Sequence, residues 1–466
     1  MKLILNTEEK PRKSTLVTIL NTLYQVYLNE DDISIIPIAN INGSFSFKYN
    51  IITSVPILNF NEIELELVSG SSSFIDYLIF EEDNPGRKNL VAMIEETKTD
   101  DSESRNTGAY QRASKFVYAN SQIFILNGKQ YDFREIPKFI LYTNRNEFLK
   151  KPTDTAIFGA RLLKTIGVNI IGKNEYYNNL SSFNSVDEII DFKKNMSPPQ
   201  KGNIPILIEK NYNFERNNYY SISGLLSNPK SKKNMKNDPN IGALTLISAG
   251  IRKFDKISPI YIIEHHVGQD YIDNSKGNKF LYIARELNIT LEGLIYDKDK
   301  FRNNMFREYF KMEDCSEKVT TIFLHIILEN IGAKLIYENH AGCERGYFHR
   351  PNGEEIALPK ELPIPDLVMQ LPTGKVLIIE GKKLENFSNG IAELNNYNLI
   401  EDYYIKPDYN NPLIERWVTT FGEVISELPH EKILFHLDID GNFILNPKAP
   451  AELIKALGKW LVNNKS

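Results

Sequence analysis

Cysteine is scarce in this chain, since only Cys315 and Cys343 occur among its 466 residues. No CxxC motif and no Cys/His cluster is present, which argues against a structural zinc site and favours a reduced protein. Long apolar runs are also missing, because the most apolar stretch, residues 241–251, is too short to span a bilayer. Residues 1–13 carry too short an apolar run for a signal peptide. We therefore expect a cytoplasmic protein with no membrane partner.

A phosphate-binding loop of the GxxxxGK[ST] type is absent, so ATP is not an expected partner. The net charge is small, at −5, and does not exclude a nucleic-acid partner, because local basic patches decide such binding. The composition, 42% hydrophobic and 25% charged, is that of a globular protein. A chain of this length exceeds one compact core, and we expect about two to four domains.

One chemical arrangement occurs twice in the sequence. An aspartate beside an apolar run is followed, after a turn, by an apolar strand that ends in Glu-x-Lys. The first copy is SFIDYLIF at 73–80 with LVAMIEETK at 90–98, and the second is PIPDLVMQL at 363–371 with KVLIIEGKK at 375–383. Two carboxylates and a lysine at one edge of a sheet can hold a divalent metal and activate a water for phosphodiester cleavage. The sequence therefore predicts two nuclease sites.

Strand geometry brings the members of each set together. The glutamate and the lysine are two positions apart and share one face of a strand. The aspartate precedes its glutamate by 20 positions in the first set and by 14 in the second, which suits two neighbouring strands joined by a turn. The alternative for each set is an ion pair at a strand end, because Glu-x-Lys alone also arises by chance. The candidate catalytic residues are Asp76, Glu96, Lys98, Asp366, Glu380 and Lys382.

The surroundings of the two sets follow one order: a helix, strands, the aspartate strand, the Glu-x-Lys strand and another helix. Helical spacing predicts the flanking helices at 14–28 and 107–119 for the first set, and at 314–332 and 389–400 for the second. A proline-containing polar stretch between the halves is typical of a linker. We predict an N-terminal nuclease-like domain at 1–195, a middle region for DNA recognition at 196–305 and a C-terminal nuclease domain at 306–466.

Both sets resemble the PD-(D/E)XK nuclease superfamily, and within it type II restriction endonucleases. The second set keeps Pro365-Asp366 and Glu380-Gly381-Lys382. The resemblance covers about residues 14–120 and 316–400. It implies an α/β chain with two restriction-endonuclease-like domains, each a central mixed sheet flanked by helices. It also implies Mg²⁺ as the cofactor, cleavage to 5′-phosphate ends, and a protective methyltransferase in the same cell.

The resemblance assigns roles to individual residues. In each set the aspartate and the glutamate would bind the metal, and the lysine would serve the attacking water. Glu329, late on the helix before the second set, matches an additional acidic metal ligand that many family members carry. The first set departs from the pattern, because Ile75 replaces the proline and its opening helix has no matching glutamate. Candidate DNA contacts are Gln111, Arg112, Lys230, Lys232, Lys233 and Lys236.

The leading hypothesis is a Mg²⁺-dependent, sequence-specific endonuclease that cuts double-stranded DNA, with one site for each strand, so that a monomer on DNA suffices. A second hypothesis is that only the C-terminal site cuts, the N-terminal fold binds DNA, and the chain acts as a homodimer. A third is a DNA-binding protein built from inactive nuclease folds, and a fourth is a structure-selective repair or recombination nuclease. Lys98 and Lys382 argue against the third hypothesis, because an inactive site does not need them.

Overall fold

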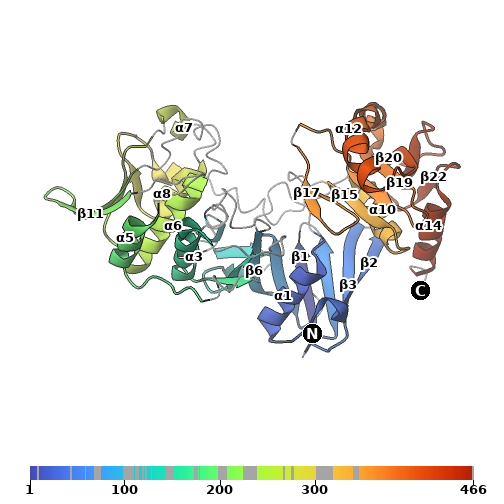
Figure 1. The fold of residues 1–466 in the computed structure, drawn as a ribbon. Helices are drawn as coiled ribbons and strands as arrows, with labels where there is room; N and C mark the ends of the chain where they lie inside the picture. The colour runs from blue at the N-terminus through green and yellow to red at the C-terminus, as the bar shows by residue number, and fades with distance from the viewer. Residues whose placement is uncertain are drawn as a thin grey trace. The chain divides into compact units, whose positions relative to one another are not determined.

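The structure is a computed structural model, and Figure 1 shows its fold. It describes residues 1–7, 10–41, 45–57, 59–67, 75–84, 86–97, 110, 115–117, 120, 123–126, 129–142, 152–172, 177, 179–197, 207–223, 239–265, 268–273, 278–300, 318–339, 346–359 and 361–463. Within these residues the chain is a mixed α/β protein with several mixed sheets flanked by helices. No helix among them is long and apolar enough to cross a membrane.

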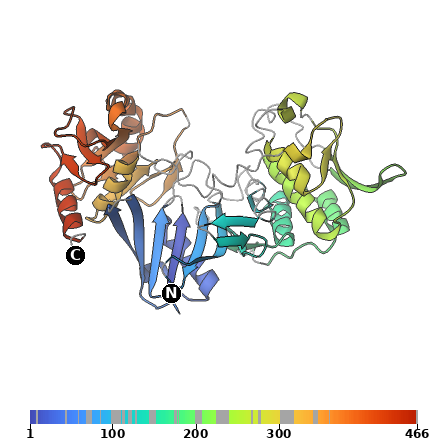
Figure 2. The same ribbon diagram turned by 180° about the vertical axis from the view of Figure 1, so that it is seen from behind.

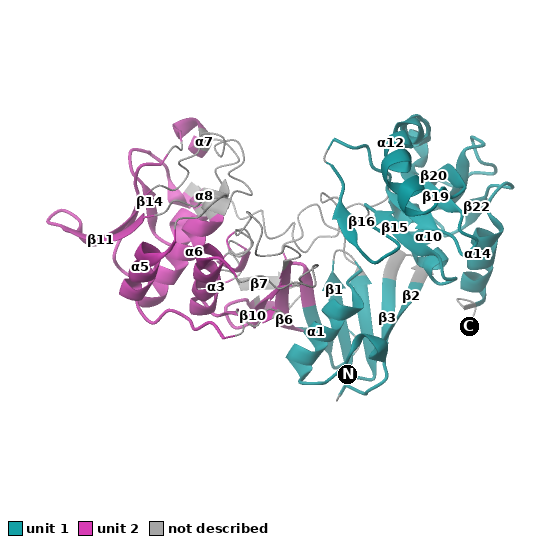
Figure 3. Ribbon diagram, in the orientation of Figure 1, with its two compact units in different colours: residues 1–73, 79–89, 308–466 teal, residues 74–78, 90–307 magenta. Residues whose placement is uncertain are grey.

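The chain forms two compact units, which Figure 3 shows in different colours. Unit 1 contains residues 1–73, 79–89 and 308–466, and unit 2 contains residues 74–78 and 90–307. The units are therefore built from separated segments and do not coincide with the three consecutive parts predicted from the sequence. The reason is that two strands, β5 (Tyr77–Glu82) and β6 (Lys88–Thr97), each contribute residues to both units. Independent folding of the three predicted parts stays a prediction.

The first segment of unit 1 contains four neighbouring strands of a mixed sheet. Their order is β1-β4-β3-β2, in which β1 runs parallel to β4 while β2, β3 and β4 are antiparallel neighbours. Helix α1 covers one face of these strands in Figure 1, and Figure 2 shows the sheet from behind. The elements are β1 (Lys2–Thr7), α1 (Lys13–Tyr24), the short helix η1 (Glu30–Asp32), β2 (Ile33–Ile41), β3 (Phe45–Thr53) and β4 (Glu62–Leu67).

The last segment of unit 1 contains a second mixed sheet, of strand order β15-β18-β19-β20-β21-β22 among the described residues. Strands β19, β20 and β21 are parallel, and the remaining neighbours are antiparallel. The strands are β15 (Lys334–Glu338), β18 (Leu367–Gln370), β19 (Val376–Lys383), β20 (Ile414–Gly422), β21 (Ile433–Asp438) and β22 (Phe443–Leu445), beside a small hairpin of β16 (Tyr347–His349) and β17 (Glu355–Ala357).

Helices enclose this second sheet. Helix α10 (Val319–Glu329) packs against β18, β19 and β20, and also against β2 and β3 of the first sheet. Its residues 319–328 are all buried, which suits a helix that is apolar on every side. It ends at Glu329, with Asn330 as the C-cap residue, and Gly332, whose φ of 90° is left-handed, lies in the turn that follows. The other described helical elements are η6 (Leu384–Asn386), α11 (Phe387–Glu393), η7 (Leu394–Tyr397), α12 (Asn398–Ile400), η8 (Glu401–Ile405), α13 (Lys406–Asp408) and α14 (Ala451–Asn463).

Unit 2 contains three parallel neighbouring strands in the order β10-β9-β6. It also contains a separate sheet of order β11-β12-β13-β14 among the described residues. Its strands are β7 (Ile123–Leu126), β8 (Lys129–Asp132), β9 (Lys138–Tyr142), β10 (Val168–Gly172), β11 (Leu207–Asn213), β12 (Asn217–Ser223), β13 (Ile260–Ile262) and β14 (Ile289–Leu291). Its helices are α3 (Asp154–Thr165), α5 (Val186–Asn195), α6 (Pro239–Phe254), α7 (Gln269–Asp273), α8 (Asn278–Glu286) and the short η5 (Lys298–Lys300).

Candidate active site

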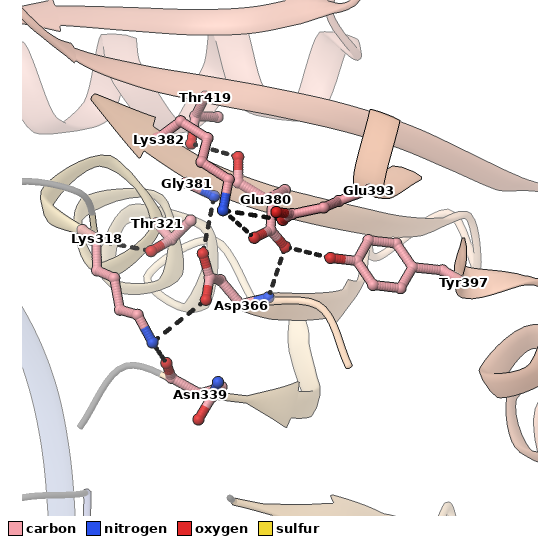
Figure 4. A network of polar contacts seen from close by, with 10 residues as sticks. All are labelled: Lys318, Thr321, Asn339, Asp366, Glu380, Gly381, Lys382, Glu393, Tyr397 and Thr419. Atoms are coloured by element: carbon pink, nitrogen blue, oxygen red, sulfur yellow. Dashed lines mark hydrogen bonds and ion pairs between the residues drawn. The ribbon is translucent and has the colours of Figure 1, made fainter. Parts of the chain in front are cut away.

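The residues of the second sequence set lie together where β18 begins and β19 ends (Figure 4). These strands are antiparallel, and Leu367 pairs with Ile379, so that Asp366, which precedes β18, lies level with Glu380. Glu380 and Lys382 share one face of β19 because side chains alternate along a strand. The sequence prediction that these three residues meet at one edge of a sheet agrees with this geometry. We refer to them as the Asp366 site.

Two reciprocal hydrogen bonds hold the carboxylates. The Asp366 N–H donates to Glu380 Oε2 at 3.3 Å, and the Gly381 N–H donates to Asp366 Oδ2 at 3.0 Å. One oxygen of each carboxylate is therefore positioned by the backbone of the facing strand. Backbone donors of this kind keep carboxylates in place before a ligand arrives.

Lys382 bridges two carboxylates. Its Nζ lies 2.8 Å from Glu380 Oε1 and 2.9 Å from Oε2 of Glu393, at the end of α11. Gly390 permits this arrangement, because a Cβ at that position would lie only 2.8 Å from Lys382 Cγ. Burial alone would lower the pKa of Lys382, but Glu380 and Glu393 outweigh burial and raise the pKa above its ordinary value. Lys382 is thus a stable ammonium group.

The helical segment after β19 supplies a further contact that the sequence analysis did not assign. The Tyr397 hydroxyl donates a hydrogen bond of 2.5 Å to Glu380 Oε2. Glu393 and Tyr397 are four residues apart, so both side chains face the sheet from one side of this helical segment. That spacing, inside a helix predicted to follow the Glu-x-Lys strand, is the signal that could have identified them.

Lys318, at the N-terminus of α10, is a second contact that the sequence analysis did not identify. Its Nζ lies 3.3 Å from Asp366 Oδ1 and also donates to the Asn339 carbonyl. The Asn339 N–H in turn donates to the Asp366 carbonyl at 2.8 Å. The site therefore contains two lysines, one on each carboxylate. The sequence contains no pattern that identifies Lys318, because the approach of the α10 N-terminus to β18 is a tertiary contact.

Burial sets the electrostatics of the two carboxylates. Asp366 is 6% exposed and Glu380 is 4% exposed. Burial, together with the neighbouring Asp366 carboxylate, raises the pKa of Glu380 to about 8. Burial also raises the pKa of Asp366, against the opposing effect of Lys318. Two buried carboxylates that disfavour each other's ionisation form a site whose charge a cation would stabilise.

Glu329, predicted as an additional metal ligand, lies elsewhere. It is the last residue of α10, whereas Lys318 precedes the first. The rise of a helix separates these two positions by about 16 Å along the helix axis. Glu329 instead forms an ion pair with Lys10, which lies between β1 and α1. The structure thus does not bring Glu329 to Asp366, because the sequence pattern defines the helix but not which of its ends meets the site.

The first sequence set is arranged differently from the prediction. The Asp76 N–H donates to Glu95 Oε2 at 3.3 Å, and the Glu96 N–H donates to Asp76 Oδ2 at 2.7 Å. The carboxylate of Glu96 accepts a hydrogen bond of 2.7 Å from the Tyr77 hydroxyl. Glu95, rather than the predicted Glu96, therefore faces Asp76. Lys98 lies outside the described residues, as do Gln111, Arg112, Lys230, Lys232, Lys233 and Lys236.

The donor set of the Asp366 site suits a hard divalent cation. Among the described residues, no group of three or more His, Cys, Asp and Glu side chains is placed to hold a metal ion. Mg²⁺ does not require such a group, because it keeps several waters and takes one or two carboxylates together with substrate phosphates. Asp366 and Glu380 are a pair of this kind, and oxygen donors of two buried carboxylates fit Mg²⁺ better than zinc.

Comparisons with known proteins identify no relative of this chain. No protein-family model, no curated protein and no solved structure matches it.

Proposed function

We propose that this chain is a Mg²⁺-dependent, sequence-specific endonuclease of the restriction type that cuts double-stranded DNA. One observation carries the proposal: two buried carboxylates, Asp366 and Glu380, are held by reciprocal backbone hydrogen bonds beside Lys382. The likeness of this set to the PD-(D/E)XK pattern supports nuclease chemistry in particular. On this proposal the two mixed sheets are the cores of restriction-endonuclease-like domains, and unit 2 contains the region for DNA recognition.

Asp366 and Glu380 are the residues that would hold Mg²⁺. When bound, Mg²⁺ supplies charge stabilisation at the phosphate and lowers the pKa of a coordinated water. Metal binding requires both carboxylates ionised, so the elevated pKa of Glu380 makes it compete with a proton.

The side chains of the site have separate roles. Lys382 remains an ammonium group, so it orients the attacking water and offsets phosphate charge rather than removing a proton. Tyr397 and Glu393 hold the Glu380 carboxylate and the Lys382 amine in position. Lys318, 3.3 Å from Asp366, adds positive charge that attracts the DNA backbone.

The reaction is hydrolysis of one phosphodiester bond. The water oxygen bonds to phosphorus, and the bond from phosphorus to the 3′ oxygen breaks. The 3′ oxygen leaves with a proton, and the other proton of the water passes to solvent. The products are a 5′-phosphate and a 3′-hydroxyl, and neither ATP nor any oxidant is consumed.

Cleavage of supercoiled plasmid tests the proposal. Wild-type protein should cut in Mg²⁺ and leave the plasmid intact in EDTA, while Lys382→Met should cut at least about 100-fold more slowly. Lys375→Met is the matched control, because Lys375 precedes the same strand, pairs with Glu415 at 2.7 Å and lies roughly 23 Å from Lys382 along β19. Intact DNA of varied sequence after incubation with wild-type protein and Mg²⁺ would refute the proposal.

The pattern of products identifies the type of substrate. Discrete fragments from long linear DNA indicate a fixed recognition sequence, as we propose. Preference for branched or nicked duplexes over linear DNA would instead indicate the structure-selective nuclease that the sequence leaves open. Either result would also be followed by sedimentation on DNA, which distinguishes a monomer from a homodimer.

A further inference from the structure

The backbone around Asp76 reproduces the hydrogen bonds of the Asp366 site. In both places the aspartate is the residue immediately before a strand, β5 or β18. In both, its N–H donates to a glutamate Oε2 at 3.3 Å, and its Oδ2 accepts from the residue after that glutamate. This match pairs Glu95 with Glu380 and Glu96 with Gly381. It holds although the sequences of the two segments differ.

The topology around the two glutamates also matches. The strand that carries Glu380, β19, is followed by a helical crossover to a parallel neighbour, β20. The strand that carries Glu95, β6, likewise precedes a crossover to the parallel neighbour β9, and residues 115–117 in that crossover are helical. Such an arrangement places the first helix after the strand next to the strand's end.

A lysine reaches the glutamate from this helical segment. Lys115 Nζ donates to Glu95 Oε1, as Lys382 Nζ donates to Glu380 Oε1. In β19 the amine belongs to Lys382, two residues after Glu380, whereas the residue two after Glu95 is Thr97, which has no amine. Next to Glu95 the amine is supplied by the helical segment instead of by the strand. Lys115 is anchored because the next two residues, Phe116 and Val117, are buried.

Burial distinguishes Glu95 from an ordinary surface ion pair. Its side chain is fully buried, whereas Lys115 retains 27% of its side-chain exposure. A buried carboxylate is costly unless charged partners offset it, so an exposed surface pair does not explain its position. Glu96 serves a different purpose, because its side chain lies on the opposite face of β6 with the Tyr77 hydroxyl.

We propose that Asp76, Glu95 and Lys115 form a second metal-dependent nuclease site, and that each of the two sites cuts one strand of the duplex. The inference rests on the proposed function of the Asp366 site. Asp76 and Glu95 hold the second divalent cation, and Lys115 takes the role of Lys382. The bonds made and broken are those of the hydrolysis described above, once on each strand.

Strand-resolved cleavage tests the inference. The substrate is a duplex carrying the recognition sequence, labelled on one strand or the other. Lys115→Met should cut one strand at the wild-type rate and the other on the order of 100-fold more slowly. Lys382→Met should show the opposite strand preference, and plasmid should be nicked rather than linearised by both. The inference would be overturned if folded Lys115→Met lost cleavage of both DNA strands, or if it cut both at the wild-type rate.

Two adjacent substitutions provide a sharper contrast. Glu95→Gln should abolish cleavage of the same strand as Lys115→Met, whereas Glu96→Gln should cut both strands. If Glu95→Gln cut both strands at the wild-type rate while Glu96→Gln failed to cut one strand, the metal ligand would be Glu96, as predicted from the sequence. That result would refute the assignment of Glu95.

A metal titration separates failure of this inference from failure of the proposed function. Calorimetry with Mn²⁺ alone should give two sites per chain in the wild type, one in Glu95→Gln and two in Glu96→Gln. One site in the wild type, with cleavage dependent on Lys382, refutes the second site and leaves the proposed function standing. Absence of cleavage by the wild type refutes the proposed function itself, whatever the stoichiometry.

Discussion

Gly390→Ala tests whether the position of Lys382, rather than its mere presence, supports cleavage. Gly390 lies in the middle of α11, where the new methyl group would be 2.8 Å from Lys382 Cγ and 3.2 Å from a Val418 methyl. Ordinary van der Waals contact begins near 3.4 Å, so the lysine or the helix must move by about 0.6 Å. Val418 is buried in β20, which directs the displacement toward Lys382.

Two opposing effects determine the stability of this variant. Alanine favours a helix over glycine by about 1 kcal/mol, while overpacking costs about 1–3 kcal/mol. The free energy of unfolding should therefore fall by only about 0–2 kcal/mol. Activity should suffer more, because a displacement approaching 1 Å in a catalytic group costs on the order of 10- to 100-fold in rate.

The assay is plasmid cleavage in Mg²⁺ together with urea unfolding of the same preparation. Gly458→Ala is the matched control, because Gly458 lies in α14 and nothing beyond the adjacent backbone of its own helix lies within 4 Å of the place that its new methyl group would occupy. It should be stabilised by about 1 kcal/mol and cut like the wild type. A folded Gly390→Ala protein that cuts at the wild-type rate would refute the argument that Gly390 positions the lysine.

Three further predictions concern the same region. Tyr397→Phe should weaken Mn²⁺ binding about tenfold, measured by calorimetry, because Glu380 loses a hydroxyl donor, whereas Tyr409→Phe, outside the site, should not. The pKa of Glu380 is raised from 4.5 to about 8, so the metal-free carboxyl stabilises the fold less as pH rises through this range. Because a proton on Glu380 competes with the metal, Mn²⁺ affinity measured by calorimetry should increase about tenfold per pH unit up to about pH 8 and then level off. Glu329→Gln should lower the free energy of unfolding in urea by about 1–3 kcal/mol, because Lys10 loses its charged partner. Its cleavage rate should stay within about twofold of the wild-type rate. Loss of cleavage at unchanged stability would instead support Glu329 as a metal ligand.

The sequence allowed the Asp366 site to be predicted because its main residues belong to one hairpin. Strand alternation relates Glu380 to Lys382, and a short turn brings Asp366 level with them, so local rules were sufficient. The contacts that helices make with the site could not be predicted from the sequence. Tyr397 and Lys318 meet the site through packing between elements far apart in the chain, and helical periodicity does not specify which helix end approaches a sheet.

The first set shows a different limit. Glu95 and Glu96 are adjacent, so a strand must point one of them toward Asp76 and the other away. The Glu-x-Lys pattern favoured Glu96 because Lys98 follows it. The hydrogen bonds favour Glu95, and its amine comes from Lys115, 20 residues later. A pattern that requires the lysine on the same strand cannot detect a lysine supplied by the next helix.

The division of unit 1 along the chain has a consequence during protein synthesis. Strands β2 and β3 are made early, but α10, which packs against them, belongs to the segment that starts at residue 308. At about 5–20 residues per second, the ribosome needs on the order of 10 to 50 s to go from residue 73 to residue 308. Throughout that interval the nascent chain lacks Asp366, Glu380 and Lys382. If the chain has the proposed nuclease function, its Asp366 site can form only after residue 382 has been made, which delays that activity relative to the synthesis of β2 and β3.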